Sequence, residues 1–479
     1  MKWILCVALA ALLSACAAVG PDYQAPTTAE LGVPPVWRTP GVDAGAAGDL
    51  AAWWQRLGDA TLTDLVGRAL TNNRDVASAT ARLREARARR DLAIANQFPL
   101  VAASGGITRT QSGSQHAGGG SSLYQAGFDA SWEPDLFGGQ RRAVEAARAD
   151  LGAAAGDLAA IRVSLAAEVA RNYTDVRSLQ ARLGIAQANL DAQSQTLQLT
   201  QWRAQAGLTT SLDVEQAATA VEQTRAALPA LDTSLADARN RIAVLAGVAP
   251  GAFDAALDVP APLPAVPASI AIGIPADTLR QRPDLLAAER RLAAETARVG
   301  QQTAALYPSL DLSGTLGLQS LTLAGVTHGG ALVAQVAAQL AATVFDAGRV
   351  RRQIDIQTAV QERALSDYQG AVLTALEDVE NALVAFDNAE RRRAALANAA
   401  TSARNAALLA GQRYSAGITD FQTVLDTQRT VLVAVDALAG SENDRVQALV
   451  QLYKALGGGW TPESTDAPTT TGRAATPKA

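Results

Sequence analysis

An internal repeat constrains the fold of this chain more than any other feature of its sequence. Residues 203–209 (RAQAGLT) recur as residues 413–419 (RYSAGIT), an offset of 210 positions. Further upstream, Arg82 and Arg291 keep nearly the same offset, 209 positions. Matching residues at a stable offset over so long a stretch indicate two consecutive copies of one structural unit.

The two copies set the expected domain organisation. We expect the first copy at residues 61–248 and the second at residues 276–457. Residues 249–275 between them are rich in proline, which is typical of an extended linker. Residues 16–60 precede the first copy. Residues 458–479 are rich in Thr, Pro and Ala, and are expected to form a flexible C-terminal tail.

Each copy contains a segment that is too long for a helix in an ordinary globular core. Residues 138–206 and 348–416 contain no proline, and at ~1.5 Å per residue each could extend about 100 Å. Shorter helices are expected to return from them at residues 211–247 and 420–456. Hydrophobic residues make up 48% of the chain but aromatic residues only 4%, so most apolar side chains are Ala, Leu and Val. This composition suits long helices that pack closely side by side.

Two β-hairpins are expected between the helices, at residues 99–133 and 309–343. Their strands alternate apolar and polar residues over ~10 positions, the length of a tilted membrane-spanning strand. The alternating segments are residues 99–109, 124–133, 310–319 and 332–343, and the loops between them are residues 111–121 and 320–330. Half-buried strands of a soluble sheet are the alternative. Polar residues such as Asp129 and Asp311 on one face favour a membrane barrel with a wet lumen.

Four strands cannot close a barrel by themselves. Unpaired strand edges are not tolerated in hydrocarbon, because no water is present to bind their N–H and C=O groups. If the hairpins cross a membrane, the chain must therefore oligomerise.

The first residues are typical of a secretion signal. Lys2 supplies a positive charge, and an apolar stretch up to Leu13 follows it. Residues 1–15 are expected to be a signal peptide. The Leu-Ser-Ala-Cys sequence that ends at Cys16 resembles a lipobox, where bacterial lipoproteins receive a diacylglycerol and an N-acyl chain. An ordinary signal peptide with a chance cysteine is the alternative; Cys6 would be removed in either case.

Several short motifs of the chain resemble those of the TolC-like outer membrane factors. They are Val19-Gly-Pro-Asp-Tyr23, Trp53-Trp54, Trp132-Glu-Pro-Asp-Leu-Phe-Gly138, Phe345-Asp-Ala-Gly348, Arg413-Tyr-Ser-Ala-Gly417 and Val424-Leu-Asp-Thr-Gln428. Each motif is weak alone, but together they keep the order and spacing of the family over nearly the whole mature chain. With its lipobox, the chain is more similar to the NodT/OprM-type outer-membrane lipoproteins of resistance-nodulation-division (RND) efflux systems.

This resemblance implies a homotrimer with one continuous pore. The implied fold class is mainly α with a membrane β-barrel part: a long α-helical barrel plus a 12-stranded β-barrel, with four strands per chain. The chain would be lipid-anchored in the outer membrane and extend into the periplasm. It would passively conduct small molecules such as drugs, delivered by an inner-membrane RND pump and a periplasmic membrane-fusion adaptor, to the exterior.

The resemblance also implies a gate at the periplasmic end of the pore. Asp426 matches the family position of a constricting carboxylate, and a solvent-exposed helical aspartate is the alternative. Gln422, one helical turn earlier, stands where a close relative has an apolar residue. Arg413 and Tyr414 match residues that hold neighbouring helices together, and Asp213 is their expected partner.

The turns between the long and the returning helices are the expected docking sites of the adaptor. They contain Gly207, Leu208 and Thr209 in the first copy, and Gly417, Ile418 and Thr419 in the second. The two glycines suit the left-handed conformation that commonly ends a helix.

The sequence supports neither catalysis nor a bound cofactor, metal or nucleic acid. His116 and His328 fall in the outer loops, without a Cys or carboxylate cluster at ligand spacing. The formal net charge of −5 is unlike that of a basic nucleic-acid-binding domain. Two other functions stay open: an outer channel for protein secretion or metal-cation efflux, and a lipoprotein scaffold without a pore.

Overall fold

The computed structural model describes residues 18–39, 50–111, 120–267, 275–327 and 331–461. Within it the chain forms two compact units. Unit 1 lies within Met1–Pro26, Ala81–Ala155 and Leu286–Gly370, and unit 2 lies within Thr27–Thr80, Gly156–Leu285 and Ala371–Ala479. Each unit takes residues from both sequence copies, so the two copies are not two separate domains.

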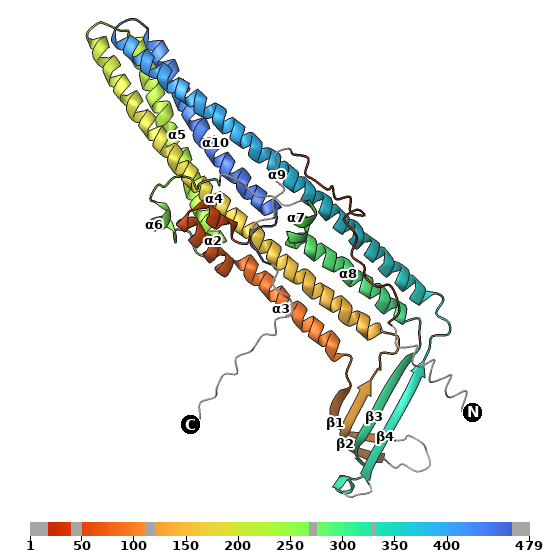
Figure 1. Cartoon of the computed structure of the whole chain (residues 1–479). Helices are drawn as coiled ribbons and strands as arrows, with labels where there is room; N and C mark the ends of the chain where they lie inside the picture. The colour runs from red at the N-terminus through yellow and green to blue at the C-terminus, as the bar shows by residue number, and fades with distance from the viewer. Residues whose placement is uncertain (1–17, 40–49, 112–119, 268–274, 328–330, 462–479) are drawn as a thin grey trace. The chain divides into compact units, whose positions relative to one another are not determined.

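Helices make up most of both units (Figure 1). The helices are η1 (Trp53–Leu57), α2 (Ala60–Asn72), α3 (Arg74–Ala95), α4 (Gly139–Gln205), α5 (Ser211–Leu245), α6 (Asp254–Leu257), α7 (Pro275–Gln281), α8 (Pro283–Ala304), η2 (Ala324–Thr327), α9 (Arg349–Ser415) and α10 (Phe421–Ala455). Helices α4 and α9 each contain 67 residues and lie one residue inside the predicted ranges at both ends. None of the described helices is long and apolar enough to cross a membrane.

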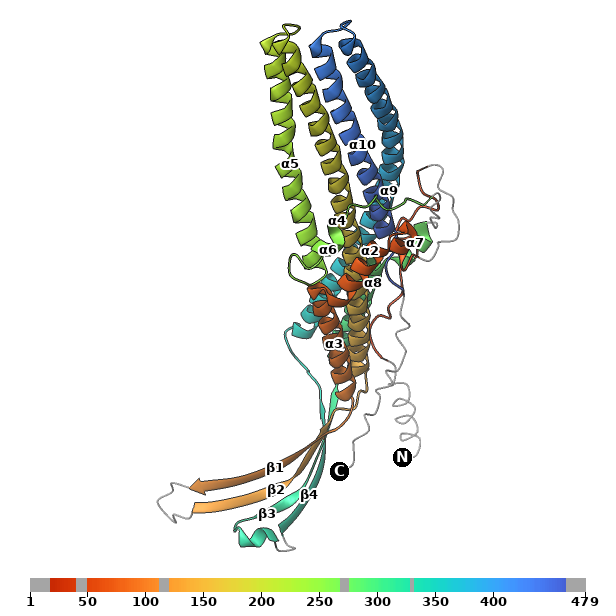
Figure 2. The same ribbon diagram turned by 90° about the vertical axis from the view of Figure 1, so that its left-hand side faces the viewer.

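Unit 1 contains one antiparallel sheet in the order β1-β2-β3-β4 (Figure 2). The strands are β1 (Leu100–Gln111), β2 (Gly120–Trp132), β3 (Ser309–Ser320) and β4 (Leu332–Ala341). Polar and apolar rows alternate across the sheet. One row is Ala102, Asp129, Thr315 and Gln335, and the next is Ala103, Phe128, Leu316 and Ala334. The predicted alternation is therefore present in the observed register.

The sheet exposes large apolar side chains. Phe128, Leu316 and Val336 are 58%, 54% and 89% exposed. Within the described residues, β1 pairs only with β2 and β4 only with β3, so the outer edges of both strands present unpaired N–H and C=O groups. The exposed apolar side chains need an apolar environment to cover them, and the unpaired edges need strands of other chains to pair with.

Three of the hairpin strands extend beyond their predicted segments, whereas β4 ends at Ala341, two residues before its predicted end. Strand β1 continues to Gln111 and β2 begins at Gly120, so both strands extend into the predicted loop 111–121. The predicted loop 320–330 contains the short helix η2. The residues at these strand ends, such as Thr110, Gln111 and Ser121, are polar on both faces, so the alternation of apolar residues does not reach them.

The helical part of unit 1 packs through small side chains. Ala149 of α4 lies against Ala293 and Ala294 of α8, and Tyr23 covers this contact. Near the sheet, the rings of Phe137 and Tyr307 stack with centroids 4.7 Å apart. Alanine allows two helix backbones to approach closely, which agrees with the low aromatic content of the chain.

Unit 2 has a more ordinary core beside its long helices. Trp53 and Tyr453 are fully buried, and their rings stack at 5.1 Å between centroids. The buried guanidinium of Arg177 donates to the carbonyl of Val259 at 2.8 Å and to the hydroxyl of Tyr173 at 3.0 Å. The segment between the two copies is thereby held against helix α4.

The structure differs from the predicted organisation at three places: the linker, helix α2 and the C-terminal tail. The predicted linker 249–275 is not wholly extended, because α6 forms within it and buries Leu257. Helix α2 was not predicted as a separate element; Asp59 caps its first turn and Asn73 ends it. The predicted tail begins too early, because the indole N–H of Trp460 donates to the carbonyl of Gln281 at 2.9 Å. The rest of that tail, residues 462–479, lies outside the described residues.

Candidate functional site

The connections from α4 to α5 and from α9 to α10 lie side by side at one end of unit 2 (Figures 1 and 2). Both have the same backbone geometry. Gly207 and Gly417 adopt φ values of +70° and +73°, the left-handed conformation expected for them. The N–H of Leu208 donates to the carbonyl of Arg203 at 2.8 Å, and the N–H of Ile418 donates to that of Arg413 at 2.9 Å. These bonds close the last turn of each long helix in a Schellman motif.

The returning helices begin with side-chain caps. Asp213 accepts hydrogen bonds from the hydroxyl of Thr209 and from the backbone N–H of Thr210, while Thr210 accepts from the N–H of Asp213. In the second connection, Asp420 accepts from the N–H of Thr423 at 2.9 Å. Each connection is therefore fixed at both helix ends.

Tyr414 joins the two helix pairs. Its ring is buried in a cluster with Ala217 and Ala220 of α5 and with Phe421 and Val424 of α10. The centroids of Tyr414 and Phe421 are 5.6 Å apart. This cluster is the apolar contact between the first and second copy at their paired ends.

Arg203 of α4 stacks on the same ring. Its guanidinium carbon lies 4.4 Å from the centroid of the Tyr414 ring, and Nη1 donates to the carbonyl of Tyr414 at 3.2 Å. Arg203 was not among the residues predicted for this site. The repeat offered a signal, because Arg203 is the counterpart of Arg413 in the first copy.

The expected pairing of Asp213 with Arg413 is not present in the chain. The carboxylate of Asp213 is occupied by the cap of α5. The Arg413 side chain is exposed and makes no hydrogen bond or ion pair within the described residues. The structure does bring Tyr414 to the junction of the two helix pairs, but its partner there is Arg203.

Asp426 and Gln422 lie on one exposed face of α10. The amide of Gln422 donates to Oδ1 of Asp426 at 3.0 Å, and Nη1 of Arg429 is 3.9 Å from the same oxygen. Gln422 therefore forms a polar pair with the carboxylate in place of a separate apolar layer.

The two connections differ in the character of their exposed side chains. In the first copy, Trp202 and Leu212 are 58% and 63% exposed, whereas the exposed Leu208 has an equally apolar counterpart in Ile418. The repeat counterparts of Gln422 and Asp426 in the first copy are Leu212 and Gln216. The carboxylate of Asp426 thus has no counterpart in the first copy, which presents the apolar Leu212 in place of Gln422.

The predicted lipidation site Cys16 lies outside the described residues, as do the two loop histidines, His116 and His328. Among the residues that the structure does describe, no group of three or more His, Cys, Asp or Glu side chains could hold a metal ion.

Comparisons with known proteins agree with this architecture. The family model for outer membrane efflux proteins matches residues 65–248 and 274–458. The chain is 34% identical over 467 residues to the pyoverdine export outer membrane protein OpmQ of Pseudomonas aeruginosa, covering 94% of this chain and 96% of OpmQ. It is 30% identical over 467 residues to the toluene efflux pump outer membrane protein TtgF of Pseudomonas putida, and the match covers 95% of this chain and 96% of TtgF.

A solved structure is similar over the same extent. The outer-membrane channel OprN superposes with a TM-score of 0.87 at 36% sequence identity, covering 93% of this chain and all of that one. The long helices, the four-stranded sheet and both sequence copies thus all fall within the shared region. The chain belongs to the outer membrane efflux protein family, and it is an outer-membrane channel component rather than an enzyme.

Proposed function

We propose that the chain is the outer-membrane duct of a tripartite RND-type efflux system and that it works as a homotrimer. The observation that carries this proposal is a sheet with two unpaired edges and an exposed apolar row. In hydrocarbon each unpaired backbone group costs several kcal/mol, so the edges must pair with other chains. Three chains joined edge to edge would supply twelve strands, which is within the range of closed membrane barrels.

The gate of this duct is proposed at the second-copy helices α9 and α10. In a trimer, Asp426 would occur three times around the axis, and Gln422 would orient each carboxylate through its hydrogen bond. Arg203 and Tyr414 would hold the helix pairs of one chain together, and the exposed Arg413 would be available to a neighbouring chain. Three carboxylates near one axis attract cations and repel each other.

Single-channel conductance in planar bilayers tests the gate. We expect Asp426→Ala, alone or with Arg413→Ala, to raise the conductance, because charge and contacts at the constriction are lost. Glu215→Ala is the matched control, since it removes an exposed carboxylate from the start of α5. Unchanged conductance in both Asp426 variants, or an equal rise in Glu215→Ala, would contradict the assignment.

The adaptor is proposed to dock at both helix connections. The exposed side chains of Leu208 and Ile418, 72% and 68% exposed, sit immediately after the two left-handed glycines. Trp202 and Leu212 extend the apolar surface on the first copy. Clustered exposed apolar residues commonly mark protein interaction sites.

The cargo is proposed to be small molecules, chosen by the pump rather than by the duct. OpmQ and TtgF are named for pyoverdine export and toluene efflux, yet their identities to this chain are similar, 34% and 30%. We also propose acylation at Cys16, which would anchor the start of the mature chain in the outer membrane.

A further inference from the structure

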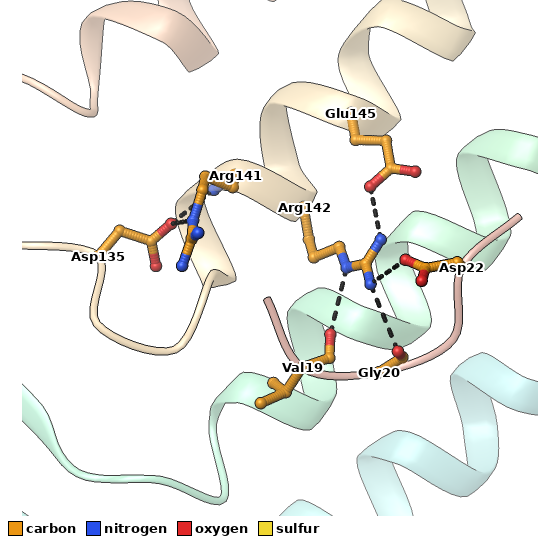
Figure 3. A network of polar contacts seen from close by, with 7 residues as sticks. All are labelled: Val19, Gly20, Asp22, Asp135, Arg141, Arg142 and Glu145. Atoms are coloured by element: carbon orange, nitrogen blue, oxygen red, sulfur yellow. Dashed lines mark hydrogen bonds and ion pairs between the residues drawn. The ribbon is translucent and has the colours of Figure 1, made fainter. Parts of the chain in front are cut away.

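The start of the described chain is held in place by one buried arginine. We call residues 18–23 the N-terminal strap. Arg142 of α4 points into this strap, and the strap curves around its guanidinium group (Figure 3). Nε donates to the carbonyl of Val19 at 3.2 Å, and Nη2 donates to the carbonyl of Gly20 at 3.3 Å and to the carboxylate of Asp22 at 2.7 Å.

The remaining bond of Arg142 is made within its own helix. Nη1 donates to Glu145 at 2.7 Å. The side chain of Arg142 is only 5% exposed. Three of its four hydrogen bonds thus go to the strap, and these bonds satisfy a guanidinium group that the folded chain covers almost completely.

Glycines allow the strap to lie this close to the helices. A Cβ atom on Gly20 would lie 2.4 Å from Cα of Gly300 in α8, and Gly20 has a φ of +90°. A Cβ on Gly300 would lie 2.9 Å from Nε of Arg142. A Cβ on Gly138 would lie 2.5 Å from Cα of Ala18. A side chain at any of these three glycines would therefore collide with the strap, with α8 or with Arg142.

The second copy provides an internal comparison. Arg352 is the repeat counterpart of Arg142 and likewise bonds an acidic residue three positions on, Asp355, at 3.0 Å. Its side chain, however, is 83% exposed. Gly348, the counterpart of Gly138, has the same left-handed conformation, but a Cβ placed on it would meet no atom of the described residues within 4 Å. The counterpart of Gly300 is Asp91, so the second copy has a side chain at the position where the strap lies against a glycine in the first copy.

We infer that Arg142 is a positioning residue that holds the N-terminal strap on the first copy and thereby fixes the lipid anchor beside the turn between β2 and α4. The N–H of Val19 donates to the carbonyl of Phe137 in that turn at 3.1 Å, so the strap begins at the base of the sheet. The inference rests on the proposed acylation of Cys16, two residues before the strap. Acyl chains held there would enter the bilayer next to the strands that must insert into it.

Hydrogen exchange of the purified full-length protein in detergent tests the docking. Arg142→Ala should raise the exchange rate of the strap amides about tenfold or more, because the bonds to a charged group are lost. Arg352→Ala, at the equivalent position of the second copy, should leave them unchanged. Gly20→Ala tests the strap without altering either helix and should give the same rise, even if Arg142→Ala fails to fold. Unchanged strap exchange in Gly20→Ala, or an equal rise in Arg352→Ala, would overturn the docking role.

A cellular assay tests the positioning role. Arg142→Ala should still incorporate labelled palmitate, whereas the amount of trimer in the outer membrane should fall several-fold; Arg352→Ala should match the parent chain in both measurements. Parental trimer levels in both Arg142→Ala and Gly20→Ala would overturn the inference. If the parent chain incorporates no palmitate, the anchor is absent and the inference fails, but conductance still tests the proposed channel separately.

Discussion

At position 414 the aromatic ring, rather than the hydroxyl group, makes the observed contacts. The guanidinium of Arg203 stacks on the ring, and the ring packs against Phe421. The hydroxyl of Tyr414 has no hydrogen-bond partner within the described residues. Tyr414→Phe should therefore leave conductance and tip stability unchanged. Tyr414→Ala should cost about 3–5 kcal/mol in local packing, raise the conductance and speed exchange of the Ile418 amide. Equal behaviour of the two variants would show that the ring does not hold the helix pairs together.

The caps at residues 213 and 420 predict a local response to acid. The hydroxyl of Thr209, with the N–H and hydroxyl of Thr210, lowers the pKa of Asp213, and Thr423 lowers the pKa of Asp420 in the same way. Both pKa values are depressed in the folded state, so these carboxylates stabilise the folded protein fully at a pH above their unfolded-state pKa of about 3.9. That stabilisation is lost as the pH falls through the pKa that each carboxyl has in the folded state.

Amide exchange in the first turns of α5 and α10 measures this response. Both turns should be protected at about pH 5 and lose protection below about pH 3.9. Asp213→Asn should remove the pH dependence from α5 and leave it in α10. An α5 turn whose protection still titrates in Asp213→Asn would contradict the assignment to this carboxylate.

At the scale of the elements, the junction between the two hairpins depends on paired glycines. Gly127 of β2 lies directly opposite Gly317 of β3, and a Cβ on Gly127 would be 2.7 Å from Cα of Gly317. Gly127→Ala should therefore push the two hairpins apart and reduce the yield of trimer that resists detergent. Gly314→Ala is the matched control, because its nearest neighbour would be 3.6 Å away, an ordinary contact. Equal trimer yields from the two variants would contradict this account.

The elements that the sequence predicted well are those with a long or repeated pattern. Helices α4 and α9 follow from uninterrupted proline-free segments, and the sheet faces follow from alternation around residues such as Phe128. Helix α6 is too short to carry a periodic pattern, and it forms because Leu257 is buried by the fold. In the candidate site, the glycine conformations were predictable from local chemistry. The stacking of Arg203 on Tyr414 was not, because it depends on which helices become neighbours.

At the scale of the whole molecule, the repeat predicted two consecutive copies, but each of the two compact units contains residues from both copies. Long helices that belong to both units explain this difference, because one helix such as α4 contributes to each. The strap that breaks the equivalence of the copies was not predictable from the repeat. Its arginine is present in both copies as Arg142 and Arg352, but only Arg142 of this pair contacts the strap among the described residues, and the glycine at position 300 is an aspartate in the other copy.

Because both outer edges of the sheet are unpaired within the described residues, the chain should assemble as a trimer, and conductance with a parallel mass measurement tests this assembly. Purified protein in detergent should have the mass of three chains and show a small, flickering, cation-leaning conductance in a planar bilayer. That result would support a closed duct whose sheets complete one another. A monomer without conductance would contradict the account and favour a lipoprotein scaffold without a pore.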